Sequence, residues 1–164
     1  MPQEDRIQSM AGNQEFQAPS RVERIFNRIY GFLVGIGVGF SYNYLLQVKG
    51  RKSGKLYSTP VDLLEMEGKR FLVAPRGRTQ WVRNAEVAGE ILLKKGRQRR
   101  RFKMRPLEGP EKLRVLKAYL DRFRREVQGY FPVPADSPAG AFEQIAENYP
   151  AFEISPLGGA KFSN

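Results

Sequence analysis

The chain contains neither cysteine nor histidine. These absences exclude disulfide bonds, thiolate or Ser-His nucleophiles, and zinc sites of the usual kind. Proton transfer must then come from carboxylates, lysines, tyrosines or solvent, and no closely spaced pair of carboxylates stands out along the sequence. If the protein is an enzyme, we therefore expect an organic cofactor to supply the chemistry, without a metal.

Negative charge is also scarce. The 164 residues include 28 lysines and arginines but only 17 aspartates and glutamates, which gives a net charge of +11 and a pI near 10.1. This balance favours an anionic partner: nucleic acid, an acidic membrane surface, or a phosphorylated or carboxylated small molecule. The length and a hydrophobic content of 41% fit one compact domain.

Long apolar runs are missing as well. The apolar stretch over residues 30–46 is interrupted by Ser41, Tyr42 and Asn43, so it predicts no transmembrane span.

The first residues predict a tail and then a helix. Residues 1–19 are polar and aperiodic and lack a secretory signal, so we expect a flexible N-terminal tail in a cytoplasmic protein. Residues 20–164 then form a single domain. This domain begins with a basic amphipathic helix capped by Ser20. The helix either covers a sheet or makes a peripheral contact with an acidic membrane surface.

The segment over residues 50–55, Gly-Arg-Lys-Ser-Gly-Lys, lies between two strand-like runs, residues 44–49 and 56–66. It therefore predicts a hairpin loop. Its glycines let backbone N–H groups turn toward one point, and its three cations add full charges, so the loop suits a phosphate. The alternative is a solvated turn, which has much the same composition.

Short strands with glycine turns dominate the middle of the chain. Pro60 restricts its strand to an edge or a bulge. Thr79 is a candidate N-cap, and Gly89 a candidate end, for a helix over residues 80–88. The other expected elements are strands over residues 70–74, 90–95, 97–107 and 151–154, a helix over residues 110–129 and a short helix over residues 137–148. This order predicts an α+β fold in which a small closed or half-closed sheet has helices packed outside.

Cations alternate with apolar residues over residues 97–107. Phe102 and Met104 are expected in the core, while Arg101, Lys103 and Arg105 form a row on the other side. The row favours nucleic-acid binding, but no aromatic residues lie among these cations to stack on bases. A solvated sheet face explains the pattern at least as well, so we do not expect a nucleic-acid partner.

Four segments together carry a resemblance to a known family. They are Gly50-Arg51-Lys52-Ser53-Gly54, Thr59-Pro60-Val61, Val73-Ala74-Pro75-Arg76-Gly77 and Trp81-Val82-Arg83-Asn84. In this order and spacing they resemble the deazaflavin-dependent nitroreductase family, over roughly residues 20–155. The resemblance implies a split β-barrel of the FMN-binding, flavin-reductase-like type with flanking helices. It also implies coenzyme F(420), an 8-hydroxy-5-deazaflavin with a phosphate and a polyglutamate tail.

The resemblance further implies which residues bind the cofactor. The phosphate and tail would contact Arg51, Lys52, Ser53, Gly54 and Lys55. The ring would lie against Thr59, Pro60 and Val61 on one edge, Ala74, Pro75, Arg76 and Gly77 on the other, and the helix wall of Trp81 and Asn84. A hydride would pass to an activated double bond, quinone or nitro compound, with no catalytic side chain assigned.

Other predictions stay open at this point. Tyr42, Tyr57 and Tyr130 are candidates for an open pocket mouth, and a homodimer is possible because related barrels commonly pair. A barrel of this kind could instead bind FMN or haem. A protein of a different class would be a non-catalytic basic module that binds nucleic acid or a membrane surface.

Overall fold

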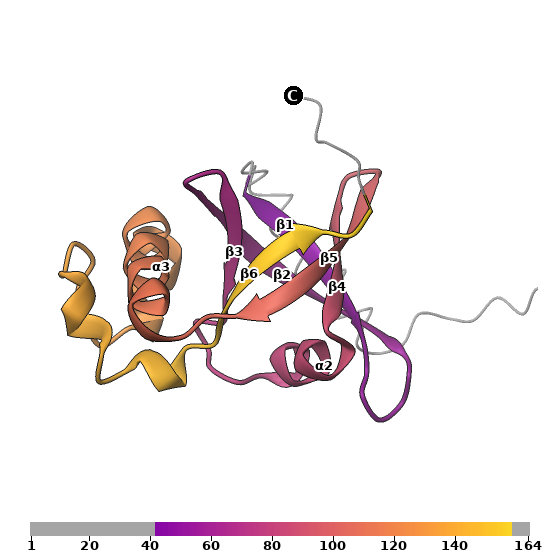
Figure 1. Cartoon of the computed structure of the whole chain (residues 1–164), viewed down its shortest axis with the longest axis horizontal. Coiled ribbons are helices and arrows are strands. Elements are labelled where there is room, and N and C mark those ends of the chain that lie inside the picture. Colours follow the sequence, from indigo (N-terminus) through magenta and orange to yellow (C-terminus); the bar gives the residue numbers. More distant parts are fainter. Residues whose placement is uncertain (1–41, 159–164) are drawn as a thin grey trace, which may run out of the picture.

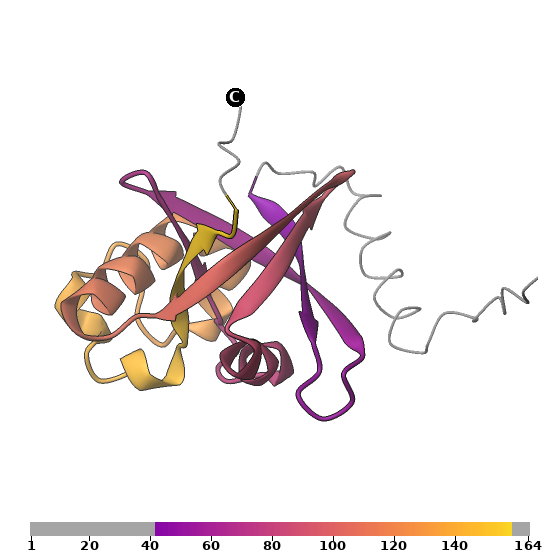
Figure 2. The ribbon, with the colours of Figure 1, turned by 45° about the vertical axis from the view of Figure 1, so that its right-hand side comes forward.

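The computed structural model describes residues 42–158, so the expected tail and basic helix lie outside the described residues. Six antiparallel strands of this part close into a barrel in the order β1-β2-β3-β6-β5-β4 (Figure 1 and Figure 2). The strands are β1 (Asn43–Lys49), β2 (Leu56–Met66), β3 (Lys69–Val73), β4 (Glu90–Lys95), β5 (Gln98–Pro106) and β6 (Ala151–Pro156). The small closed sheet expected from the strand pattern is thus confirmed.

Alternating side chains of the strands fill the barrel. In β5, Phe102 and Met104 are buried, while Arg101, Lys103 and Arg105 are exposed, as the pattern predicts. The exposed row is partly neutralised on the sheet surface. Arg101 pairs with a glutamate of β4, and Arg105 pairs with one glutamate of α3 and one of β6.

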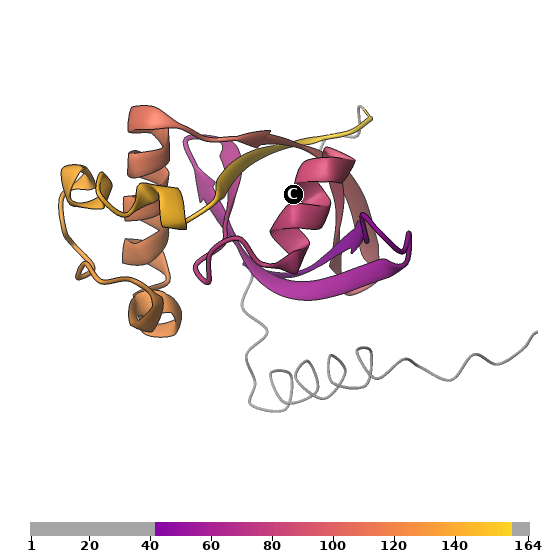
Figure 3. The same ribbon diagram turned by 90° about the horizontal axis from the view of Figure 1, so that it is seen from below.

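Helix α2 (Gln80–Ala88) lies across one end of the barrel (Figure 3). Val82 and Ala85 are fully buried and pack among the barrel side chains, so this helix closes that end. Gly89 ends the helix as expected: its φ is 70°, and its N–H group donates to the carbonyl of Ala85. Thr79 is the N-cap residue as predicted, although its side chain makes no capping hydrogen bond.

The long helix expected after β5 is divided into α3 (Gly109–Arg122) and α4 (Arg124–Val127). Phe123 separates them with φ −111° and ψ 24°. Its buried ring lies 5.0 Å from the Tyr119 ring and 4.7 Å from the Tyr42 ring, centroid to centroid. Packing this aromatic cluster stabilises the break in the helix. None of the described helices is long and apolar enough to cross a membrane.

The helix expected over residues 137–148 is wrong. The structure has short 3-10 turns here, η2 (Ala139–Phe142) and η3 (Ala146–Asn148), after a similar turn η1 (Gln128–Tyr130). Their hydrogen bonds span three residues, as from the N–H group of Glu143 to the carbonyl of Gly140. Phe142 is fully buried against the ring of Phe131, so side-chain packing shapes this segment more than helix propensity does.

We expect Phe142→Ala to lower the free energy of unfolding by about 3 to 5 kcal/mol, because it removes a fully buried ring from the packing beneath α3. Urea unfolding followed by circular dichroism measures the change. Val87→Ala is the control: its side chain is 70% exposed on α2, so the change should stay within about 0.5 kcal/mol. A loss below about 1 kcal/mol for Phe142→Ala would mean that the helical layer does not unfold with the barrel.

Candidate functional site

Strand β2 is longer than its neighbour β3, and the difference opens one flank of the barrel. β2 has 11 residues and β3 has 5. Among the described strands, residues 56–62 of β2 pair with β1 alone, and pairing with β3 begins only at Leu63. Pro60 lies in this overhang, which confirms the edge position expected for a residue without an N–H group.

A cavity of about 620 Å³ lies along the open flank. Its walls come from the β2 overhang, residues 73–76 at the end of β3 and just after it, the start of α2, and the side of α3 and α4 that faces the barrel. Most of the lining surface is apolar. The volume falls within the range of roughly 300 to 1,000 Å³ that is usual for cofactor and small-molecule pockets.

Eight of the fourteen predicted cofactor-binding residues line this cavity. They are Thr59, Pro60, Val61, Ala74, Pro75, Arg76, Trp81 and Asn84. The other six lie outside its lining: Gly77 belongs to the loop before α2, and Arg51, Lys52, Ser53, Gly54 and Lys55 belong to the turn between β1 and β2. We call residues 50–55 the cationic loop.

The cationic loop is fastened to α2 through Arg51 and Asn84. The guanidinium of Arg51 donates to Asn84 Oδ1 at 2.9 Å and to Gln80 Oε1 at 2.9 Å, and its backbone N–H group donates to Asn84 Oδ1 at 3.2 Å. Asn84 is only 4% exposed. Both Gln80 and Asn84 line the cavity, so these hydrogen bonds place the loop at one end of it.

The backbone of the cationic loop differs from the prediction. The N–H group of Gly50 donates to the carbonyl of Lys55, and that of Gly54 donates to the carbonyl of Gly50. The N–H group of Lys55 donates to Ser53 Oγ. These donors close the turn on itself and do not converge on an external anion. Lys52 and Lys55 are exposed and form no ion pair within residues 42–158, so positive charge for a ligand comes from side chains.

Several side chains shape the cavity wall. The guanidinium of Arg76 lies 5.5 Å from the centre of the Tyr130 ring, and Trp81 packs against Phe152 with ring centres 6.1 Å apart. The hydroxyl of Thr79 is buried on this wall and has no hydrogen-bond partner among the described residues. A buried hydroxyl without a partner is costly, so this part of the wall carries an unsatisfied polar atom.

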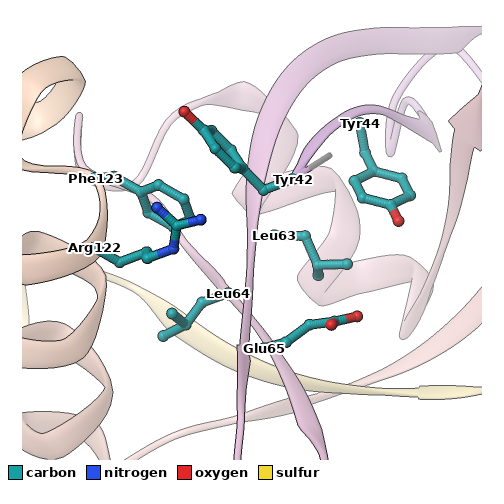
Figure 4. A pocket seen from close by; sticks show the side chains of 7 residues that line it. All are labelled: Tyr42, Tyr44, Leu63, Leu64, Glu65, Arg122 and Phe123. Atoms are coloured by element: carbon teal, nitrogen blue, oxygen red, sulfur yellow. The ribbon is translucent and has the colours of Figure 1, made fainter. Parts of the chain in front are cut away.

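The three tyrosines predicted at the pocket mouth lie in two different cavities. Tyr57 and Tyr130 line the cavity and are exposed. Tyr42 instead lines a second cavity of about 350 Å³ beside Arg122 and Phe123 (Figure 4).

Two acidic residues on the cavity wall, Asp62 and Glu126, were not predicted. They are far apart in the sequence, so no spacing pattern joins them. The pKa of Asp62 is raised to about 6, mainly because burial disfavours its charged form and also because Glu126 adds a like charge. One signal was present in the sequence: Asp62 is a lone charge within the apolar run Val61 to Leu64.

A closed antiparallel barrel with an open flank, an apolar cavity in that flank and a cationic loop beside it defines a flavin-reductase-like split-barrel protein. A family model described as F(420)H(2)-dependent quinone reductase matches residues 22–130. The chain belongs to this family. It is therefore an oxidoreductase that uses the deazaflavin coenzyme F(420), which confirms the expected enzyme class and cofactor. The barrel confirms the expected fold.

Solved structures resemble the chain at low identity. An Agrobacterium tumefaciens protein of unknown function is 18% identical with a TM-score of 0.51, over 72% of this chain and 49% of that one. An F(420)-H(2)-dependent reductase, FDR-A, is 21% identical with a TM-score of 0.47, over 70% and 95%. The haem storage protein HutZ from Vibrio cholerae is 14% identical with a TM-score of 0.49, over 85% and 93%. A search of curated proteins finds no match.

Replacing Asn84 with leucine should release the cationic loop, because Arg51 loses the buried acceptor for two of its hydrogen bonds. We expect the free energy of unfolding to fall by about 1.5 to 3 kcal/mol. Amide hydrogen exchange in the loop should be about tenfold faster or more, measured by mass spectrometry. Gln80→Ala, which removes a single exposed hydrogen bond, should have a smaller effect. Unchanged exchange in Asn84→Leu would contradict the anchoring.

Proposed function

We propose that the protein reduces quinones, or acceptors of similar chemistry, with reduced coenzyme F(420) bound along the open flank of the barrel. In this arrangement the acidic tail of the coenzyme lies on the cationic loop and its ring lies in the cavity. The observation that carries the proposal is that a cationic surface and an apolar cavity lie next to each other along the flank. A fixed arginine and two exposed lysines stand at one end, and an apolar cavity of about 620 Å³ follows.

The cationic loop suits the phosphate and carboxylates of the coenzyme tail. Arg51 is held in place by Asn84 and Gln80, so little side-chain entropy is left to lose when an anion binds. Lys52 and Lys55 remain exposed and add attraction over a longer range. A tail with several charges can use all three cations.

The cavity suits a flat ring with a few polar atoms. Pro60, Val61 and Ala74 present apolar surface, and Trp81 adds an aromatic wall. Gln80 and Asn84 add polar groups to the lining. The residues present therefore fit the coenzyme in charge, size and polarity.

When bound, the reduced deazaflavin supplies a hydride to the acceptor. The protein's own contribution is to bind, to orient and to keep water away. The apolar walls exclude water from the reacting atoms, which strengthens every electrostatic interaction inside the cavity. Tyr57 and Tyr130, both exposed at the edge of the cavity, are placed to contact the acceptor as it enters.

The alternatives lead to different expectations. Haem lacks its common ligands here, since the chain has no histidine or cysteine. FMN carries one phosphate and is tested directly below. The homodimer, the cytoplasmic location and a membrane contact through residues 20–33 stay predictions.

The double variant Arg51→Ala/Lys52→Ala should bind coenzyme F(420) more weakly by about 1 to 3 kcal/mol or more, because it removes charged hydrogen-bond donors to the tail. Quenching of the coenzyme's fluorescence measures the affinity. Arg97→Ala/Arg99→Ala is the matched control. It removes the same charge from exposed positions in and beside the β4–β5 turn, at the opposite end of the barrel from α2 (Figure 1), and should bind like the unmodified protein.

Parallel titrations with FMN and duplex DNA identify the ligand class. Tight binding of DNA below micromolar concentration, without any quenching of deazaflavin fluorescence, would overturn the proposed function. Tighter binding of FMN than of coenzyme F(420) would indicate that FMN is the cofactor. If Arg51→Ala/Lys52→Ala binds coenzyme F(420) with unchanged affinity, only the role proposed for the cationic loop is contradicted.

A further inference from the structure

The end of the cavity away from the cationic loop is acidic. Asp62 lies on β2, five residues beyond Tyr57, which is about 16 Å along an extended strand. Glu126 of α4 lines the same cavity. Within residues 42–158 neither carboxylate forms an ion pair. The cavity therefore runs from a cationic end to an acidic one.

The contacts of Asp62 leave it able to exchange a proton with a ligand. Its Oδ1 accepts from Asn43 Nδ2 at 2.6 Å, and Oδ2 has no hydrogen-bond partner among the described residues. Glu126 is engaged differently, since its Oε1 accepts from the Tyr42 hydroxyl at 3.2 Å. Within residues 42–158, the hydrogen bond to Oδ1 orients the Asp62 carboxyl group and Oδ2 accepts none.

The surroundings of Asp62 favour its protonated form. Burial, and then the charge of Glu126, raise its pKa to about 6, so a useful fraction of the carboxyl group carries a proton near neutral pH. Tyr119 also lines the cavity, and burial raises the pKa of its hydroxyl, which therefore stays neutral. Among residues 42–158, the other titratable or charged groups around this end are Tyr42, Arg122 and Tyr130, with the Arg76 guanidinium over the Tyr130 ring.

From this geometry we infer that Asp62 is a catalytic residue, the general acid that protonates the acceptor oxygen as the hydride arrives. This inference rests on the proposed function. The hydride brings two electrons and one hydrogen to the quinone, so the deazaflavin is oxidised and the quinone is reduced. The O–H bond of Asp62 breaks while the second O–H bond of the hydroquinone forms. Asp62 is left as a carboxylate and takes a proton from solvent before the next turnover, which balances the proton that the coenzyme releases to solvent after losing its hydride.

The same acidic end selects the class of acceptor. Without a proton donor, reduction would leave a hydroquinone anion in an apolar cavity beside Glu126, which is costly. Protonation by Asp62 removes that charge as it forms. An acceptor with its own carboxylate would be repelled by Glu126, so the site fits neutral acceptors that carry a reducible oxygen.

The pH dependence of hydride transfer tests the role of Asp62. The experiment mixes the complex of protein and reduced coenzyme with a neutral, water-soluble benzoquinone in single turnovers between pH 5 and 9. In the unmodified protein, the rate of hydride transfer should fall as pH rises above about 6, because Asp62 loses its proton. Asp62→Asn should lose this dependence and be about 100-fold slower or more at pH 6.

Two further variants separate chemistry from structure. Glu126→Gln removes the like charge, so the decline in rate should move to lower pH. Glu65→Gln is the control: it changes an exposed carboxylate of the same strand that pairs with Arg70 outside the cavity, and rate and profile should stay unchanged.

A readout independent of turnover uses carboxyl ¹³C-labelled aspartate. The chain has four aspartates, Asp5, Asp62, Asp121 and Asp136, so the resonance that disappears in Asp62→Asn is assigned directly. Its midpoint in the cofactor-free protein should lie near pH 6. A midpoint near 4 would overturn the inference. The inference is also overturned if Asp62→Asn transfers the hydride within twofold of the unmodified rate and with the same pH profile. If that variant binds the coenzyme normally, the proposed function remains intact. If the unmodified protein does not bind the coenzyme at all, the proposed function itself fails.

Discussion

The mismatch in length between β2 and β3 is the constraint on which the functional site depends. A closed barrel normally pairs every strand on both sides, and its interior is then filled by side chains. Here β3 ends at Val73 and the chain turns away toward α2, while the overhang of β2 has no partner on that side among the described strands. The missing pairing is replaced by a cavity. The walls of this cavity come from a strand of the barrel, the loop after β3, the helix that closes one end of the barrel, and the helices packed outside it.

The same overhang sets the electrostatic order of the cavity. Because β2 begins directly after the cationic loop and runs toward α4, one strand connects a positive end to a negative end. Two side-chain hydrogen bonds maintain this arrangement: Asn84 accepts one from Arg51 at the positive end, and Asn43 donates one to Asp62 at the negative end. Each amide side chain orients a charged group that would otherwise have many conformations. Such pre-organisation is worth more inside a dry cavity than on an exposed surface.

Sequence reasoning succeeded where the signal is local and failed where it depends on tertiary contacts. Alternation predicted the strands, Gly89 predicted the end of α2, and Pro60 predicted an edge, because each follows from backbone geometry within a few residues. The segment before β6 was wrong because burial of Phe142 shapes it. Asp62 and Glu126 were missed because only the tertiary fold brings residues of β2 and α4 to one cavity. The internal hydrogen bonds of the cationic loop likewise do not show in its composition.

A chain without histidine must obtain proton chemistry near neutral pH from another side chain. An exposed aspartate is unsuitable because it is fully ionised there, with a pKa near 3.9. The fold changes this by placing Asp62 where burial and Glu126 both oppose its charge, with no ion pair among the described residues to counter them. The resulting pKa of about 6 lies where an unperturbed histidine would titrate. In the role that we infer for it, a half-buried carboxyl group at the end of an apolar cavity takes the place of the residue that the chain lacks.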